Sequence, residues 1–408
     1  MKRTLITNIG MLATPQGTAA RGGRAQGEIC ILKNAWILIE NDVIAQVGTG
    51  AAPAAADAQT INAGGKLVTP GLVDAHTHLI FGGWRQNELA LKLHGAGYLD
   101  ILAAGGGILS TMRATQSASE EQLEAKASAA LDEMLRFGTT TAEAKSGYGL
   151  STGEECKALR VIGKLQKHHV MDLAATFMGA HAVPEAYRDN RQGYLELLCE
   201  EMLPAVQEQG IAEFCDVFCE KGVFSAEESR RILLTGRQHG LRPKIHADEI
   251  EAIGGSELAG EIGAVSAEHL IVCPPSGIAS MAEGGTVACC LPATSFYLGA
   301  AYAPVQDMVQ AGVPVAMATD FNPGSCPCLN MQLVISLGCL RYRLTPEQAL
   351  TAVTLNGAAA ICRADRIGSI EPGKQADILI WNAEDLDYIC YRLGSNLVDT
   401  VIKKGNVV

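Results

Sequence analysis

Two histidines one residue apart, His76 and His78, have a type and spacing that indicate chemistry. They follow a Pro-Gly turn and a short apolar run (residues 72–73) that is typical of a strand. Alternate residues of a strand point to one side, so both imidazoles can be directed at a single point just beyond the strand. Imidazole is a ligand for zinc, iron and nickel. A His-x-His pair alone is common by chance, so the indication of a metal site depends on the rest of the chain.

Polar residues also follow several other apolar segments. Five of the nine histidines stand at such strand ends, and the other four lie in helical or loop stretches. A single histidine of this kind is explained by an ordinary hydrogen bond, but the shared placement of five is not. The five are His76, His78, His181, His246 and His269.

The elements that must position these residues alternate between short apolar strands and longer amphipathic segments. Residues 119–137 are one such segment, with a helical spacing of apolar positions. Eight strands in this alternation predict an α/β fold, a (β/α)8 TIM-like barrel, over residues 69–362. A doubly wound open sheet is the alternative, but no Gly-x-Gly-x-x-Gly follows a strand. The predicted strands are 71–76, 139–144, 172–178, 214–218, 243–247, 264–268, 286–290 and 314–319.

The two ends of the chain share a different pattern, β-branched runs separated by Asn, Asp and Gly. Residues 1–68 and 363–408 both show it, and both flank the barrel. We therefore expect them to pair into one small β-sandwich domain formed by both chain termini.

The predicted metal ligands are His76, His78, His246 and Asp320. In such a barrel the active site lies where the strands end, and these residues stand at the ends of predicted strands 1, 5 and 8. Three neutral imidazoles and one carboxylate suit Zn2+ or Fe2+/Fe3+ and leave a position for water. The competing explanation for Asp320 is a helix cap or an Asx turn. We also expect Asp320 to accept the proton of that water.

Two further residues are predicted to act in catalysis. Glu249 stands three residues after His246, in reach of a substrate as an acid or base, although it could also be a surface loop carboxylate. His269 is placed to polarise or orient the water, and either Glu249 or His269 could deliver a proton to the leaving group. The fourth strand offers no Lys or Glu before Glu220, and a second, bridged ion commonly needs one there, so we expect a single ion.

Composition restricts the partners. The net charge of -12 argues against nucleic acid and anionic membranes. No signal peptide and no run of about 20 apolar residues is evident. The thirteen cysteines contain no Cys-x-x-Cys pair and predict free thiols in a reducing cytoplasm, and Cys326-Pro327-Cys328 is better explained by packing than by ligation. A homodimer is the default expectation for an enzyme of this size.

The strand-end residues resemble the mononuclear pattern of the amidohydrolase superfamily. Residues 368–377 are similar to the segment that closes its β-sandwich domain, and the match covers essentially the whole chain. Within the superfamily the chain resembles the imidazolonepropionase family, through the runs 74–85, 145–150, 179–184 and 319–325. Cys326 stands where that family suggests a second serine.

The resemblance implies hydrolysis of the ring amide of 4-imidazolone-5-propanoate to N-formimino-L-glutamate, in histidine degradation. Arg85 would bind the anionic propionate through a bidentate fork, although alone it could equally be a surface arginine. The implied substrate-binding residues are Arg85, Tyr148, His181, Glu249, Asn322, Gly324 and Ser325.

Two alternatives remain at this stage. A cytosine- or guanine-type deaminase of the same superfamily shares the ligand set and the spacing of His246 and Glu249, but a neutral base needs no carboxylate clamp. A non-catalytic scaffold on this fold would commonly have lost ligands, and here all four predicted ligands are present.

Overall fold

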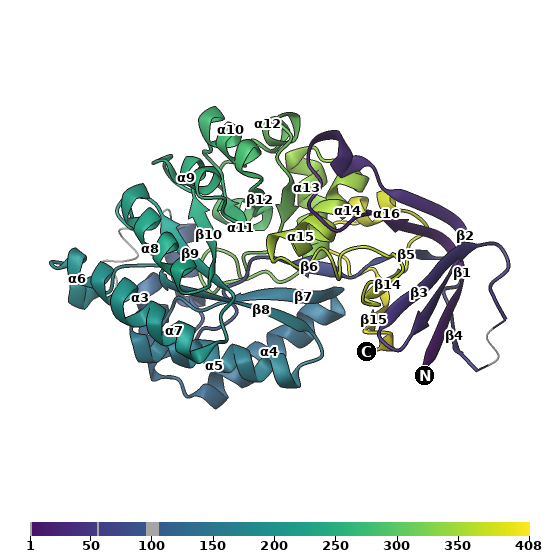
Figure 1. Cartoon of the computed structure of the whole chain (residues 1–408), viewed down its shortest axis with the longest axis horizontal. Coiled ribbons are helices and arrows are strands. Elements are labelled where there is room, and N and C mark those ends of the chain that lie inside the picture. The colour runs from purple at the N-terminus through teal and green to yellow at the C-terminus, as the bar shows by residue number, and fades with distance from the viewer. Residues whose placement is uncertain (1, 55–56, 95–105) are drawn as a thin grey trace.

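The computed structural model describes residues 2–54, 57–94 and 106–408, and contains two eight-stranded sheets (Figure 1). The barrel sheet runs in chain order and its strands are parallel, as predicted. Each strand lies within a few residues of its expected range. The strands are β6 (Leu72–Asp74), β7 (Thr139–Lys145), β8 (Asp172–Ala180), β9 (Phe214–Cys219), β10 (Arg242–Ala247), β11 (Ser266–His269), β12 (Val287–Cys290) and β13 (Val315–Met317).

Helices follow the barrel strands and cover the outside of the barrel (Figure 1). They are α3 (Ile108–Ser117) and α4 (Glu120–Arg136) after β6, α5 (Thr152–His168) after β7, α6 (Arg191–Glu196), η4 (Leu197–Met202) and α7 (Leu203–Gln209) after β8, α8 (Ala226–Gln238) after β9, α9 (Gly255–Glu261) after β10, α10 (Pro275–Gly284) after β11, α11 (Pro292–Leu298) and α12 (Val305–Gln310) after β12, and α13 (Met331–Tyr342), α14 (Pro346–Val353) and α15 (Leu355–Ala360) after β13. Short helices elsewhere are η1 (Gly23–Gly27), η2 (Gln86–Glu88), α1 (Leu89–Leu93), η3 (Glu185–Tyr187) and α16 (Leu386–Tyr391).

The helix expected at residues 119–137 is α4. Ser119 caps it, because its hydroxyl accepts the N–H of Gln122 while the Gln122 side chain accepts the N–H of Ser119. Leu123 and Leu131 on its apolar face are buried against the barrel. The local sequence therefore determines both where this helix begins and which side it buries.

The barrel closes at the strand ends that carry the site residues. Beyond β6 and β13, Thr77 and Phe321 form a parallel bridge. The N–H of Asp320 donates to the carbonyl of His76 at 3.0 Å, and the N–H of His78 donates to the carbonyl of Phe321 at 2.9 Å. Closure of the barrel therefore brings the first and last predicted ligand segments together.

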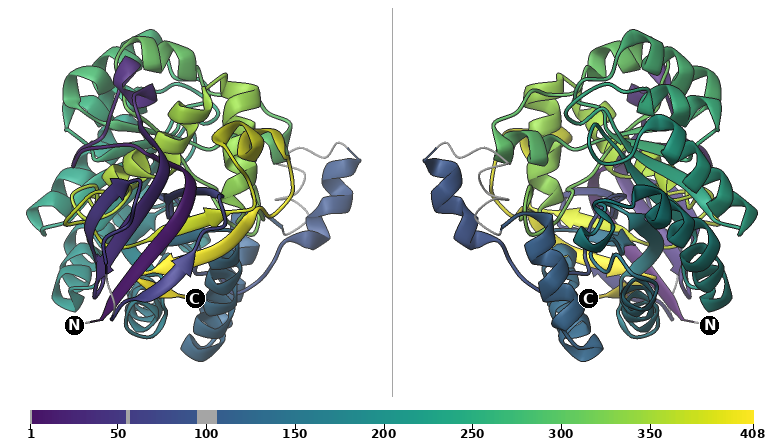
Figure 2. Two further views of the ribbon diagram at one scale, coloured as in Figure 1. Left: turned by 90° about the vertical axis from the view of Figure 1, so that its right-hand side faces the viewer. Right: turned by 90° about the vertical axis from the view of Figure 1, so that its left-hand side faces the viewer.

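The second sheet contains strands from both ends of the chain, as expected. Figure 2 shows the purple N-terminal strands beside the yellow C-terminal ones. The long first strand pairs with the second strand with a register shift between Ile6 and Ile9. It also pairs with two further strands, one through residues 4–7 and one through residues 11–12. The strands are β1 (Arg3–Thr14), β2 (Cys30–Glu40), β3 (Val43–Thr49), β4 (Gln59–Asn62), β5 (Leu67–Pro70), β14 (Ile378–Trp381), β15 (Val398–Lys403) and β16 (Asn406–Val407), in the order β16-β15-β14-β5-β1-β2-β3, with β4 beside β1.

A charged cluster joins this terminal sheet to the barrel. Asp172, the first residue of β8, accepts hydrogen bonds from Lys403 Nζ at 2.7 Å and Lys404 Nζ at 2.6 Å. Lys403 also donates to Asp377 at 2.6 Å.

Through the described residues, no helix has the length and apolar composition needed to cross a bilayer. The domain boundaries given above stay predictions.

Candidate metal centre and active site

The four predicted metal ligands lie around one point at the end of the barrel. Asp320 Oδ1 lies 3.4 Å from His76 Nε2 and 3.5 Å from His78 Nε2. His246 Nε2 lies 3.3 Å from His78 Nε2. All four side chains are buried. The structure therefore brings together residues that are up to 244 positions apart (320 - 76) in the chain.

This donor set fits a divalent metal ion. Ligand atoms bound to tetrahedral zinc at about 2.1 Å are about 3.4 Å from one another, which is close to the separations above. His76 Nε2 is buried and has no hydrogen-bond partner among the described residues, as expected for a nitrogen that binds a metal ion. Burial, together with the charge of Lys145, lowers the pKa of His76 well below its usual value and keeps the imidazole neutral.

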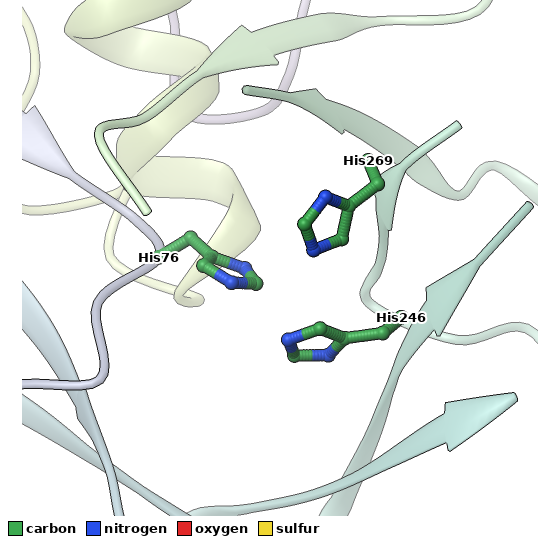
Figure 3. A group of neighbouring side chains, drawn as sticks. All are labelled: His76, His246 and His269. Carbon is green, nitrogen blue, oxygen red and sulfur yellow. The ribbon is translucent and has the colours of Figure 1, made fainter. Parts of the chain in front are cut away.

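His269 approaches the same cluster from β11. Ligand atoms of His76, His246 and His269 all lie within 4.8 Å of one another (Figure 3). His269 Nε2 also lies 3.6 Å from Glu249 Oε2. His269 (φ 68°) and Asp320 (φ 57°) both adopt the left-handed backbone region, which is unusual for residues other than glycine and common at functional sites.

Two carboxylates orient the histidines from behind. Glu268 Oε2 lies 2.8 Å from His76 Nδ1, and Asp216 Oδ1 lies 3.1 Å from His246 Nδ1. An ionised carboxylate only accepts, so each Nδ1 carries the proton and each Nε2 keeps its lone pair for the cluster. Neither carboxylate has a role among the residues predicted from sequence.

A fully buried layer of charge lies beneath these carboxylates. Lys145 Nζ contacts Asp216 at 2.7 Å and Glu143 at 2.9 Å, and Lys244 Nζ contacts Glu143 at 3.0 Å and Glu268 at 3.4 Å. Burial raises the pKa of Asp216, but His246 and Lys145 outweigh it and hold that pKa well below the usual range. A sequence signal for this layer exists, because charged residues stand inside short apolar strands. Glu143 and Lys145 share one face of β7, and Lys244 shares a face of β10 with His246.

Tyr148 and His181 form one wall of the site. The His181 ring stacks on His78 with ring centroids 4.8 Å apart, and the Tyr148 ring lies 5.1 Å from His181. Both side chains are buried. Burial lowers the pKa of His181 to about 3, so this ring is neutral at physiological pH.

Arg85 lies against the loop that follows β13. A Cβ atom added to Gly324 would lie 1.2 Å from Arg85 Nη2, so the guanidinium occupies space that only a glycine leaves open. Arg85 Nε lies 3.5 Å from Glu88 Oε2, and the arginine side chain is 15% exposed. Arg85 is therefore not a surface arginine.

The Asx turn of this segment is centred on Asn322 rather than on Asp320. Asn322 Oδ1 accepts the N–H groups of Gly324 at 2.8 Å and Ser325 at 2.7 Å. The carboxylate of Asp320 instead accepts the hydroxyl of Thr294 at 2.7 Å through Oδ2, which leaves Oδ1 directed to the histidines. Asn322 thus shapes the loop through its own side chain.

Glu249 is mostly buried, with 16% of its side chain exposed, and is not a surface loop carboxylate. Burial raises the pKa of Glu249 to about 7 although His246 opposes the shift. A carboxyl group with a pKa near 7 can both hold and release a proton at neutral pH.

Cys326 packs in the core behind the loop. Its side chain is buried, and its carbonyl accepts the N–H of Asn322 at 2.9 Å. Cys326 and Cys328 are both free thiols, in agreement with a packing role.

The chain is similar to curated enzymes along its whole length and to solved structures in its fold. Curated imidazolonepropionases from Alkaliphilus metalliredigens (strain QYMF) and Bacillus cereus (strain G9842) are 50% and 48% identical to the chain, and the alignments cover all of this chain and 98% and 97% of those proteins. Solved structures with the same fold include an atrazine chlorohydrolase from Arthrobacter aurescens complexed with zinc (TM-score 0.73, 18% identity, 99% of this chain and 94% of that one) and the guanine deaminase of E. coli (TM-score 0.75, 16% identity, 100% and 99%).

A family model described as the amidohydrolase family matches residues 67–408, which is most of the chain. The curated relatives extend the match through the N-terminal strands. The chain belongs to the amidohydrolase family and, within it, to the imidazolonepropionases.

Proposed function

We propose that this enzyme hydrolyses the ring amide of 4-imidazolone-5-propanoate to N-formimino-L-glutamate, a step of histidine degradation. Relatives about 50% identical along the whole chain carry the name imidazolonepropionase and support this substrate. One structural observation in this chain supports the same substrate: the guanidinium of Arg85 lies against Gly324, in the loop that follows Asp320. That position suits an anionic tail on a ring held at the histidine cluster.

We propose that His76, His78, His246 and Asp320 hold one divalent ion, Zn2+ or Fe2+/Fe3+. The amidohydrolase family is metal-dependent, and the grouping of His76, His78 and Asp320 supports this assignment. So does His76 Nε2, which is buried and has no hydrogen-bond partner among the described residues. Such an ion acts as a Lewis acid on a carbonyl and lowers the pKa of water toward about 7.

The substrate is held through its tail and its ring. Arg85 binds the propionate in a bidentate fork, where a charged hydrogen bond is stronger than a neutral one. Tyr148, His181 and Glu249 hydrogen-bond the N–H and C=O groups of the ring. The loop of Asn322, Gly324 and Ser325 supplies backbone and hydroxyl contacts. Together these contacts place the amide carbon over the histidine cluster.

Two carboxyl groups move the protons. Asp320 accepts a proton from the attacking water as the general base. Glu249 donates a proton to the ring nitrogen as the C–N bond breaks, and His269 at 3.6 Å orients it. The amide carbon gains the oxygen of water and becomes the carboxylate of the product.

The test is the loss of imidazolone absorbance with purified, metal-loaded enzyme, measured beside ammonia release from cytosine and guanine. The proposal expects turnover of imidazolone propionate alone. Ammonia release from a neutral base, without imidazolone turnover, would favour the deaminase instead.

We also propose that the enzyme works in the cytoplasm as a homodimer on a small-molecule substrate, without nucleic-acid or membrane partners. The net charge of -12 argues against nucleic acid and anionic membranes, and the free cysteines suit a reducing cytoplasm. The homodimer is the default expectation for an enzyme of this size. Light scattering on the purified protein tests the dimer.

A further inference from the structure

The segment after β7, residues 146–150, carries Tyr148 into the site, and we call it the tyrosine loop. It is buried throughout. Its backbone is left-handed at Gly147 (φ 106°) and at Leu150 (φ 56°), so it does not continue the strand. Buried N–H groups in such a loop need acceptors from outside the sheet.

A single carboxylate supplies those acceptors. Glu155 Oε2 accepts the N–H of Gly147 at 3.0 Å, and Glu155 Oε1 accepts the N–H groups of Gly149 and Leu150, both at 2.8 Å. The Glu155 side chain is completely buried in the first turn of α5. Across residues 2–54, 57–94 and 106–408, no lysine or arginine forms an ion pair with it. Three backbone N–H groups, together with the hydroxyl of Ser146, therefore compensate this buried carboxylate.

The loop packs directly on the helix that carries Glu155. A Cβ added to Gly149 would lie 2.6 Å from the backbone N of Glu155, so the contact requires glycine. The negative charge also lies near the N-terminus of α5, where the helix dipole favours it. The position of the loop is thus determined by Glu155 and by close backbone packing together.

The tyrosine loop in turn orients His181. The carbonyl of Gly147 lies 3.0 Å from His181 Nδ1. A carbonyl only accepts, so Nδ1 carries the proton, and in this tautomer Nε2 is the acceptor atom. The His181 ring is stacked on His78 at an interplanar angle of 16°, and Tyr148 lies beside both. The loop therefore sets the hydrogen-bonding character of this wall of the site.

We propose that Glu155 is a positioning residue for substrate binding: it holds the tyrosine loop so that Tyr148 offers an O–H donor and His181 offers an Nε2 acceptor to one ligand. The ligand class that fits this pair is a cyclic amide that presents a C=O and a ring N–H. This inference rests on the proposed function, because it concerns the same site, and it adds a residue that touches neither substrate nor metal.

The first test is Glu155→Gln in the metal-loaded enzyme. The amide keeps one acceptor oxygen and turns an NH2 group toward backbone N–H donors, so the loop should shift. We expect KM to rise at least about tenfold, with a smaller fall in kcat and unchanged metal per chain. Glu208→Gln, at an exposed glutamate on α7, is the matched control and should leave all three values unchanged.

The second test reads His181 without turnover. In the 15N spectrum of histidine-labelled enzyme, His181 of the wild type should be the Nδ1–H tautomer alone. In Glu155→Gln the spectrum should show a mixture of His181 tautomers. In a His181→Ala background, Glu155→Gln should raise KM far less than in the wild type, because the two residues act in one chain of contacts.

A Glu155→Gln enzyme with wild-type KM and an unchanged His181 tautomer would overturn the inference, and so would additive effects in the double variant. If Glu155→Gln does not fold, Glu155→Asp replaces it. The shorter side chain keeps the charge and should give an intermediate KM, whereas an unchanged KM would again overturn the inference. If the wild type does not hydrolyse imidazolone propionate, the proposed function fails, while the tautomer measurement still decides the role of Glu155.

Discussion

The Nδ1 atom of His76 lies 2.8 Å from Oε2 of Glu268, and the two side chains are completely buried. Glu268 is held in turn by the hydroxyl of Ser266 and by Lys244. The imidazole is thus oriented by a carboxylate that is itself fixed by hydrogen bonds. This is the arrangement by which proteins tune the tautomer and basicity of a metal-binding histidine.

Glu268→Gln should weaken metal binding by about 10- to 100-fold, because the amide is a poorer acceptor for His76 Nδ1–H. The measurement is a competition titration with a chelator at pH 7.5, followed by metal analysis. Glu283→Gln, at an exposed glutamate on α10, is the control. Wild-type metal affinity in Glu268→Gln would show that the carboxylate does not tune the site.

Arg85→Ala should mainly raise KM for imidazolone propionate. Loss of a charged hydrogen bond costs roughly 1.5–3 kcal/mol, which corresponds to about 10- to 150-fold in KM. A substrate analogue without the propionate should lose this dependence. An unchanged KM would remove Arg85 from the substrate site.

Gly324→Ala should also raise KM, because the new methyl group would occupy the position of the Arg85 guanidinium. The effect should shrink in an Arg85→Ala background, where the clash is gone. Gly153→Ala is the matched control, since a Cβ there meets nothing within 4 Å. Equal effects of Gly324→Ala in both backgrounds would contradict this account of the glycine.

Asp172→Asn should destabilise the fold near neutral pH by weakening the junction between barrel and terminal sheet. Burial raises the pKa of Asp172, but Lys403, Lys404 and Gln375 outweigh it and lower that pKa from 3.8 to about 2. Because the folded-state pKa lies below the unfolded one, the stabilisation is present above about pH 4 and is lost as the pH falls toward 2.

We expect Asp172→Asn to lower the free energy of unfolding by about 1–2 kcal/mol at pH 7, an amount already reduced for the partial exposure of this carboxylate. The difference from the wild type in urea unfolding should narrow between pH 4 and pH 2. A difference that stays constant over that interval would assign the effect to packing rather than to charge.

The barrel and the convergence of the four proposed ligands could be predicted because both follow from local sequence patterns. Apolar strands alternate with amphipathic helices, and the residue that follows each strand lies at the same end of a barrel. His76, His78, His246 and Asp320 stand at such ends and do converge. The strength of this prediction came from the position of each residue relative to its strand rather than from residue type alone.

The two carboxylates behind the histidines could not be predicted in the same way. The contacts of Asp216 with His246 and of Glu268 with His76 depend on the register between strands and on closure of the barrel. The role of Glu155 depends on left-handed backbone in the tyrosine loop, which no residue type reveals at Leu150. The pairing of β1 with both β4 and β5 likewise depends on contacts between segments that are distant in the chain.

The most direct measurement determines metal content and imidazolone turnover on the same samples of the wild type and of His246→Ala. We expect about one divalent ion per wild-type chain with full activity, and joint loss of ion and activity in His246→Ala, whose Nε2 lies 3.3 Å from that of His78. Full activity of either protein without bound metal would contradict the account.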